Sequence, residues 1–412
     1  MKTPAHRRLR LALLALAVTL PLNAAEPDAA TAARRDLLDL LERKGVLTAE
    51  EAAGLATPAP PPAVFPLGKN VSKLSIGGRI QVQFASLSGE VDSADDPATQ
   101  THFLLRRVYL STRAELGPDW RVNVTYNFAN SLFDVAAVQW LRPDYSVDIG
   151  YRPVNFGREQ RISSGALKAI ERSTATRYFV ESNNGNRLGA GNYHVGVFAE
   201  GKTERAYWSA AVTNPEQPAT LAAAAATGSG ANNRLAAWIE GGLLRSTDRS
   251  SLRLGTGAGW LPEQGGRTPG TGEDLFVGNV HLDYAAGAFA LLAEVFGSHH
   301  PGGAVDGSDT RALGAFVQPS WRFDKRFEGV FRIGYLDTDG RGMRMADGIP
   351  GAPVLPATDR LWDGYLGATW YIQGNDLKFQ AGLIYARGED APDGSEAETE
   401  TVGLRSQFQV NF

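Results

Sequence analysis

Apolar and polar residues alternate strictly along most of the chain. In KLSIGGRIQVQF, 73–84, Ile76 and Ile80 take one parity, whereas Arg79 takes the other. The last segment, 398–412, alternates in the same way and ends on an aromatic residue. Because side chains of a strand point alternately to the two faces of a sheet, each such segment predicts a strand with one apolar and one polar face.

The links between these segments are of two kinds. LGPD at 116–119 is a tight turn, whereas the links at about 86–101 and 339–358 are long and polar. We count about sixteen strands, an even number with short turns at one end and long loops at the other. Tryptophans such as Trp120 and Trp260 stand near segment ends, where interfacial girdles lie. The pattern predicts an all-β fold, a transmembrane antiparallel β-barrel of about 16 strands.

The N-terminus supports this class. Positive residues precede an apolar run, 11–20, and the small residues Ala24 and Ala25 follow it, so residues 1–25 have the features of a secretory signal peptide. A membrane anchor is the alternative, but the run has about half the length that a spanning helix needs. The chain has no cysteine, and its formal net charge is −4. Removal of 1–25 takes away four basic residues and no acid, which leaves about −8.

Residues 26–69 differ from the rest. The segment 34–55 has helical spacing, with a capping box from Thr48 to Glu51, and TPAPPPAVFP at 57–66 is typical of a polyproline spacer. We interpret 26–69 as a short periplasmic helical segment on a stiff linker, before a barrel domain at 70–412. Two hypotheses stay open for it, a partly disordered leader or a contact for trimerisation or the cell wall.

A soluble two-sheet sandwich would show the same alternation. Strand length, strand number and the secretory signal favour the barrel instead. A closed barrel also leaves no unpaired edge, which explains an alternating strand at the very end of the chain. The predicted location is the outer membrane of a Gram-negative bacterium, with outer-membrane lipid around the wall.

If the apolar parity faces lipid, the polar parity faces the lumen. Basic residues on the polar parity are Arg79, Arg107, Arg113, Arg121, Arg205, Arg234, Arg253, Arg322, Arg332, Lys378 and Arg405. Four acids share it, Asp148, Glu240, Asp283 and Glu294, so some of the arginines are expected to form ion pairs. The guanidinium group stays charged and matches oxyanions, so a series of weak stations would suit anion passage. A merely polar lining is the alternative.

The segment 150–179 is the densest basic cluster and is too long for a turn. It contains Arg152, Arg158, Arg161, Lys168 and Arg172. A large barrel needs something to narrow it, and a loop folded inward here would do so. The alternative is an outward loop with a solvated run of charges.

The sequence supports an enzyme less well than a channel. His281 shares a parity with Asp283, which an ordinary polar pair explains, and His299 and His300 lack a third metal ligand at a fixed spacing. The segment 255–260 lacks the strand-to-helix context of a phosphate-binding loop. We expect neither an enzyme nor a cofactor, metal or nucleic-acid partner.

Four motifs, GGRIQ, LRRVYLSTRAEL, DIGYRPVNFGREQ and IERS, resemble in order and spacing the phosphate-selective porin family, the porin O and P group. The resemblance runs from about residue 75 to the end. It implies a sixteen-stranded homotrimeric barrel whose third long loop folds into the pore, where arginines and a few lysines guide anions. By motif, the residues that would line the lumen or its constriction are Arg79, Arg107, Arg152, Arg158, Arg161 and Arg172.

The sequence thus predicts an outer-membrane channel for passive diffusion of small anions, phosphate or polyphosphate first. A general or sugar-type porin is the alternative, because Tyr109, Tyr365 and Tyr371 also take the inward parity. A structural or adhesive barrel with a plugged lumen is the third hypothesis.

Overall fold

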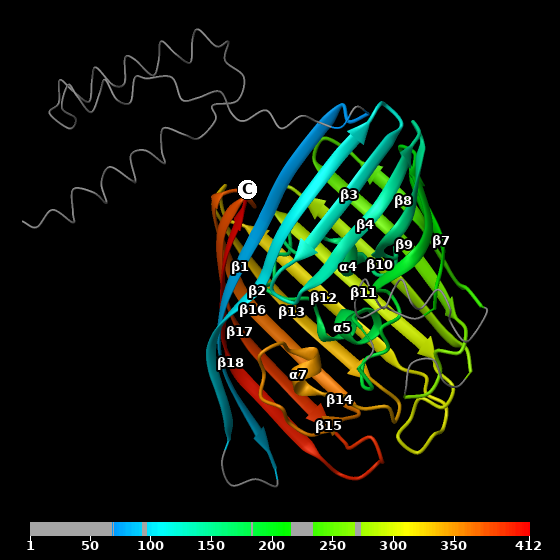
Figure 1. Ribbon diagram of the computed structural model, residues 1–412. Coiled ribbons are helices and arrows are strands. Elements are labelled where there is room, and N and C mark those ends of the chain that lie inside the picture. The colour runs from blue at the N-terminus through cyan, green and yellow to red at the C-terminus, as the bar shows by residue number, and fades with distance from the viewer. Residues whose placement is uncertain (1–67, 69, 93–96, 183, 216–233, 268–272) are drawn as a thin grey trace, which may run out of the picture. The chain divides into compact units, whose positions relative to one another are not determined.

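The computed structural model describes residues 68, 70–92, 97–182, 184–215, 234–267 and 273–412 (Figure 1). The predicted signal peptide and helical leader lie outside the described residues. None of the described helices is long and apolar enough to cross a membrane.

Sixteen antiparallel strands form a closed barrel, which confirms the predicted fold class. The strands are β1 (Lys73–Val91), β2 (Ala98–Leu116), β3 (Trp120–Asn127), β4 (Leu132–Leu141), β5 (Tyr145–Pro153), β6 (Tyr193–Lys202), β7 (Ala206–Thr213), β8 (Ala236–Ser246), β9 (Ser250–Leu261), β10 (Leu275–Ala286), β11 (Phe289–His299), β12 (Leu313–Arg322), β13 (Phe327–Asp337), β16 (Arg360–Gln373), β17 (Leu377–Glu389) and β18 (Glu398–Asn411). The last strand closes against the first, with Ile80 opposite Val410.

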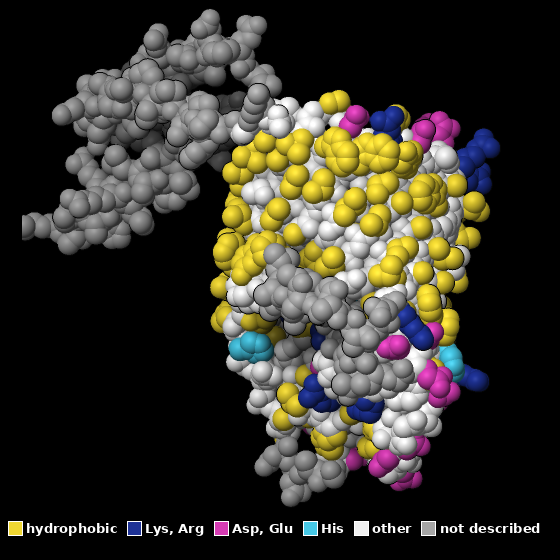
Figure 2. All heavy atoms as spheres, turned by 45° about the vertical axis from the view of Figure 1, so that its right-hand side comes forward, with side chains coloured by type: hydrophobic (Ala, Val, Ile, Leu, Met, Phe, Trp, Pro, Cys, Tyr) yellow, Lys and Arg dark blue, Asp and Glu magenta, His cyan; other side chains and the backbone are white. Residues whose placement is uncertain are grey.

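The apolar parity faces outward. Ile76 and Ile239 are 66% and 64% exposed, whereas Gln81 and Gln83 on the polar parity are buried. Figure 2 shows apolar side chains spread over the outer wall. Charged groups are costly against hydrocarbon, so the polar positions of each strand point into the barrel.

The short and long connections alternate as predicted, but the bounds of the first long link are wrong. β1 continues to Val91 and β2 begins at Ala98, so most of 86–101 is strand. Ser86 and Ser88 take the outward parity there, where a transmembrane strand would carry apolar residues. The part of a strand pair that extends beyond the hydrocarbon layer tolerates polar residues on both faces. Such a part lacks the apolar–polar alternation, so a prediction based on that pattern does not recognise it as strand.

Two long connections carry structure of their own. The loop between β5 and β6, 154–192, contains α4 (Arg158–Arg161) and α5 (Thr174–Val180). The loop between β13 and β16, 338–359, contains β14 (Met343–Arg344), α7 (Met345–Gly348) and β15 (Ala357–Thr358). We call them the 154–192 loop and the 338–359 loop.

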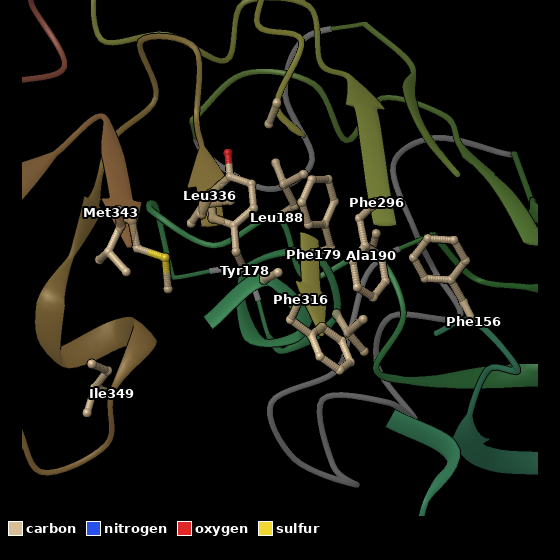
Figure 3. Close-up of a cluster of buried hydrophobic side chains, with 14 of the residues drawn as sticks. Phe156, Tyr178, Phe179, Leu188, Ala190, Phe296, Phe316, Leu336, Met343 and Ile349 are labelled. Carbon is tan, nitrogen blue, oxygen red and sulfur yellow. The ribbon is translucent and has the colours of Figure 1, made fainter. Parts of the chain in front are cut away.

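The 154–192 loop lies inside the barrel, and α5 packs against β11, β12 and β13. Phe179 is fully buried and its ring stacks on that of Phe296, with centroids 5.2 Å apart. Tyr178 and Phe316 belong to the same cluster (Figure 3). An apolar core inside the lumen holds α5 against this side of the wall.

Candidate functional site

Hydrogen bonds from the wall fasten the middle of the 154–192 loop. Gln81 of β1 donates to the carbonyl of Ser164 at 3.1 Å, and Gln409 of β18 donates to that of Gly165 at 3.0 Å. Lys378 of β17 donates to the carbonyl of Leu167 at 2.9 Å. Buried backbone carbonyls need donors, and inward side chains of β1, β17 and β18 supply them.

A cavity of about 570 Å³ lies between this loop and the wall formed by β1 to β5. The basic side chains that line it are Arg79, Arg106, Arg107, Arg152, Arg161, Arg172 and Arg187. The acidic ones are Asp134 and Glu181. The lining is therefore strongly cationic, although the chain as a whole carries a net negative charge.

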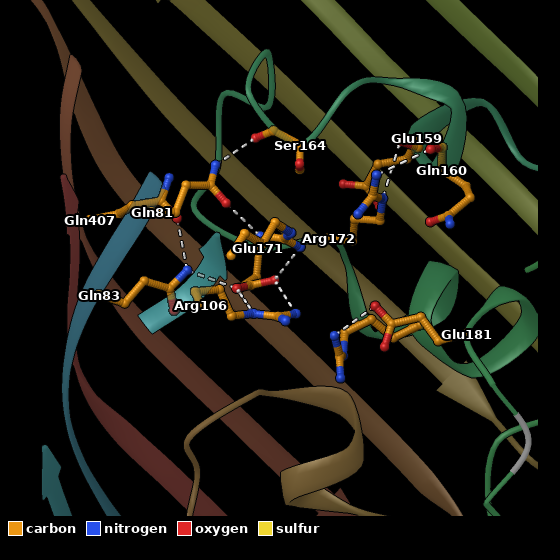
Figure 4. Close-up of polar contacts among 12 residues, drawn as sticks. Gln81, Gln83, Arg106, Glu159, Gln160, Ser164, Glu171, Arg172, Glu181 and Gln407 are labelled. Atoms are coloured by element: carbon orange, nitrogen blue, oxygen red, sulfur yellow. Dashed lines mark hydrogen bonds and ion pairs between the residues drawn. The ribbon is translucent and has the colours of Figure 1, made fainter. Parts of the chain in front are cut away.

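Two consecutive arginines of β2 reach the same carboxylate of the loop. Arg106 Nε lies 2.7 Å from Glu171 Oε1 (Figure 4). An Arg107 Nη atom lies 3.6 Å from Glu171 Oε2. The register of β1 with β2 passes from Gln81 opposite Arg107 to Val82 opposite Leu105, so Arg106 is the extra residue of a β-bulge. A bulge interrupts the alternation, which is how neighbours in sequence both face the lumen.

Burial alone would raise the pKa of the Glu171 carboxyl. The positive charges of Arg106 and Arg107 outweigh this effect and hold the pKa well below its ordinary value. Glu171 also accepts a hydrogen bond from Gln83 at 2.8 Å. It is thus an ionised anchor between the loop and the wall.

Arg79 and Arg172 differ from the other arginines of the cavity, because no carboxylate of the described residues lies within ion-pair distance of either. Arg79 donates to the hydroxyls of Ser163 and Ser164 and to Asn411. Arg172 donates only to backbone carbonyls, including that of Ile162 at 3.0 Å. Neither guanidinium group is therefore paired with an acid at the edge of the cavity.

Other predicted arginines are paired with acids. Arg152 contacts Asp148 and lies 3.5 Å from Glu200, and Arg161 bridges Glu200 and Glu240. Asp148 and Glu240 are acids that the sequence pattern placed on the inward parity. Glu200 lies on β6, the strand next to β5, and was not among the expected partners.

Two predicted basic residues of the loop point away from the cavity and do not line it. Arg158 donates to Asp283 Oδ2 through two nitrogens, at 2.9 and 2.5 Å. Lys168 Nζ lies 2.6 Å from Glu328 Oε1. Both ion pairs tie the loop to strands on the far side of the barrel.

The remaining predicted residues are dispersed along the wall. Arg113 and Arg121 donate to Asn123 and Gln139. The other three, Arg332, Lys378 and Arg405, are buried where the loop meets the wall. The structure therefore brings together only some of the predicted residues in one cavity, and their part in anion binding stays a prediction.

The sequence prediction missed Arg106, Arg187, Asp134 and Glu171 as lining or anchoring residues. Arg106 could have been found, because the outward residues change parity between Leu105 and Val108, which indicates a bulge. Asp134 and Arg187 have no such local signal, since tertiary packing alone places them. Asp134 interacts with the hydroxyls of Tyr109 and Tyr193.

The described ranges hold no group of three or more metal-ligating side chains, so the histidines within them form no metal cluster. His281 contacts the hydroxyl of Tyr207 at 2.7 Å, while Asp283 is occupied by Arg158. His300 is buried beside Arg341 among the loops.

Comparison with solved structures shows the same architecture. The outer-membrane channel DcaP of Acinetobacter baumannii matches with a TM-score of 0.53 at 12% identity, over 83% of this chain and 98% of that one. An anion-selective porin from Comamonas acidovorans matches with a TM-score of 0.51 at 12% identity, over 82% and 99%. A loop-deletion form of OmpT of Vibrio cholerae gives 0.50 at 11% identity, over 82% and 99%. At these identities the likeness shows the fold alone.

The comparison with curated proteins gave no match. The family model of phosphate-selective porin O and P, by contrast, matches residues 74–412, the whole barrel. Assembly as a trimer and a contact of the leader with the cell wall stay predictions. The chain belongs to the phosphate-selective porin O and P family, and it is a β-barrel channel of the Gram-negative outer membrane.

Proposed function

We propose that the channel conducts small anions passively, with phosphate and polyphosphate among them, along the arginines of the cavity beside the 154–192 loop. The observation that carries the proposal is the pair of arginines without carboxylate partners, Arg79 and Arg172. Two cations without a carboxylate at ion-pair distance, beside one cavity, raise the local concentration of anions and repel cations.

The arrangement of charges suits transport rather than tight binding. Arg106 and Arg107 share Glu171, and Arg161 shares its charge between two acids, so these sites attract an anion more weakly than free arginines would. Conduction requires stations that accept an ion and release it to the next. Partly neutralised arginines, beside two that have no carboxylate partner, provide stations of graded strength.

The general or sugar-type porin is the alternative, and the inward tyrosines do little to favour it. Tyr365 and Tyr371 are 4% and 5% exposed, beneath the loop, and Tyr371 donates to Glu328. Of these three tyrosines Tyr109 lines the cavity, as does Tyr193 of β6, and Arg79 lies over the Tyr109 ring with its guanidinium carbon 5.8 Å from the centroid. A continuous aromatic surface for sugars is not formed by the described residues.

Planar-bilayer recordings test the proposal. In a potassium chloride gradient, we expect the reversal potential of the native channel to show anion preference. Phosphate added to the bath should reduce the chloride current. The double variant Arg79→Gln/Arg172→Gln should lower the chloride-to-potassium permeability ratio several-fold, because it removes the two charges that have no carboxylate partner.

The matched control is Arg249→Gln/Arg326→Gln, which removes two exposed arginines from short turns and should leave the ratio unchanged. Cation preference of the native channel, or no ion preference together with uptake of neutral sugars, would contradict the proposal. An unaltered ratio in the Arg79/Arg172 variant would show that these two arginines do not set selectivity.

A further inference from the structure

A second, much smaller chamber lies behind the 154–192 loop. Its volume is about 20 Å³, and it is bounded by residues 170–174 of that loop, 348–350 of the 338–359 loop, and inward side chains of β13, β16, β17 and β18. Arg172 lines both this chamber and the large cavity, so the two are neighbours. The chamber lies where both inward loops meet the wall.

Arg405 lines this chamber, and no described residue is bonded to its guanidinium group. Its exposed fraction is 1%, and its Nε is fully buried without an acceptor. Among the described residues it takes part in no hydrogen bond and no ion pair. Arg332, also on the lining, has a buried Nε without an acceptor as well. A buried charge without a partner is strongly unfavourable.

The carboxylates that also line the chamber are already in use. Glu171 holds Arg106 and Arg107 and accepts from Gln83. Asp363 Oδ2 lies 3.7 Å from Arg332 Nε. Among the described residues neither lies within ion-pair distance of Arg405. Glu171 attracts Arg405 from farther away, but its carboxylate is already shared by Arg106 and Arg107, so Arg405 has no carboxylate partner of its own.

The size of the chamber restricts what can balance that charge. A volume of about 20 Å³ accommodates roughly one sphere of the size of a water molecule. Phosphate, with four oxygens around a central atom, is much larger than this, whereas a monatomic anion is the smallest species that carries the balancing charge. Guanidinium N–H groups are suitable donors to such an ion.

We propose that the chamber holds one resident halide ion, chloride in ordinary media, bound by Arg405 and Arg332. The ion is stationary, so the proposal concerns a site separate from the path of permeating anions. By neutralising Arg405, the ion joins the 154–192 loop and the 338–359 loop to β18. The inference does not depend on which solute the channel conducts.

Bromide identifies the ion directly. Crystals of the full chain grown in sodium bromide should give an anomalous peak in the chamber, within roughly 3.5 Å of the guanidinium group of Arg405. The peak should be absent in Arg405→Gln and present in Arg113→Gln, which removes a wall arginine outside the chamber. Clear density for Arg405 beside an ordered water, without anomalous signal, would overturn the proposal.

Hydrogen exchange provides a second measurement on the native chain, which needs no variant to fold. At equal ionic strength, backbone amides of 348, 349, 351 and 352 and of 170–174 should exchange several-fold more slowly in sodium chloride than in sodium gluconate, whose anion is too large for the chamber. Equal exchange in the two salts would count against a halide that joins the loops. If Arg405→Gln still shows slower exchange in chloride than in gluconate, the assignment of Arg405 as the group that binds the ion is contradicted.

Discussion

Arg106 Nε of strand β2 lies 2.7 Å from Glu171 Oε1 of the 154–192 loop, although the two residues are 65 positions apart in sequence. Arg107 reaches the other carboxylate oxygen of Glu171. One buried acid therefore holds the loop to the wall through two consecutive arginines. The geometry of the cavity depends on this contact.

Replacement of Glu171 by Gln should loosen the loop. Two arginines would lose their shared counter-ion in a poorly solvated site, and breaking a buried ion pair costs about 3–5 kcal/mol. We expect faster amide exchange over 163–172 and faster proteolysis within the loop. The exposed Glu204→Gln variant, in the turn between β6 and β7, should behave as the native chain. Unchanged exchange in Glu171→Gln would show that the hydrogen bonds to the loop backbone suffice.

Asp134→Asn should make the channel more selective for anions. Asp134 is one of two acids that line the large cavity, and the other, Glu181, is paired with Arg177 and Arg187. Loss of its charge leaves the cavity more positive and raises the chloride-to-potassium permeability ratio several-fold. Reversal potentials measure the effect, with Asp248→Asn in a short turn as the control. A lower ratio would place the anion path elsewhere.

The aromatic cluster beneath the loop should dominate its stability. Phe179 is fully buried against Phe296, so Phe179→Ala leaves a cavity and should cost about 3–5 kcal/mol of local stability. We expect noisier single-channel currents and faster exchange over 174–180. Val354→Ala, at a side chain that is 74% exposed, should change neither. Quiet currents and native exchange in Phe179→Ala would mean that the wall contacts hold the loop without this core.

Mild acid should open the loops around His300. Burial and then the charge of Arg341 lower the pKa of His300 from 6.5 to about 3. Because the unfolded segment binds a proton that the folded one excludes, this stabilisation is complete above pH 6.5 and is lost as the pH falls toward 3. The opening constant of 300–303, from hydrogen exchange corrected for intrinsic rates, should rise up to about tenfold per pH unit below 6.5.

His300→Gln removes the titrating group and should show a flat opening constant between pH 6.5 and 4.5. Glu171 contributes in a lower range, because its lowered pKa preserves its charge until the pH is well below 4.5. A native opening constant that stays flat down to pH 4.5 would show that His300 does not control this junction.

Strand pattern and barrel closure were predictable from the sequence because each strand must present apolar side chains to lipid on one face. Residues 73–84 and 398–412 both alternate, and the structure pairs these segments as β1 and β18. Prediction from the sequence failed where a strand no longer has to present an apolar face to lipid. Polar residues beyond the hydrocarbon concealed the extension of β1 to Val91, and a bulge concealed the inward direction of Arg106.

The candidate site was less predictable, because a lumen-facing parity does not say which charges meet. Arg158 and Arg79 are both basic and inward, yet the first is neutralised by Asp283 and the second has only neutral partners. Their difference arises from the path of the loop across the barrel, which no local pattern encodes. Arg405 differs from both, since its chamber needs two loops and four strands in place.

The fastening of the loop by Gln81 and Gln409 has a consequence for biogenesis. These donors stand on the first and the last strand, and they also bond to each other across the seam at 2.7 Å. Before the terminal strand of a nascent barrel has docked, the 154–192 loop lacks the hydrogen bond that Gln409 of β18 donates. The narrow passage is thus completed only when the cylinder seals, so an unfinished porin would be a wide and poorly discriminating hole.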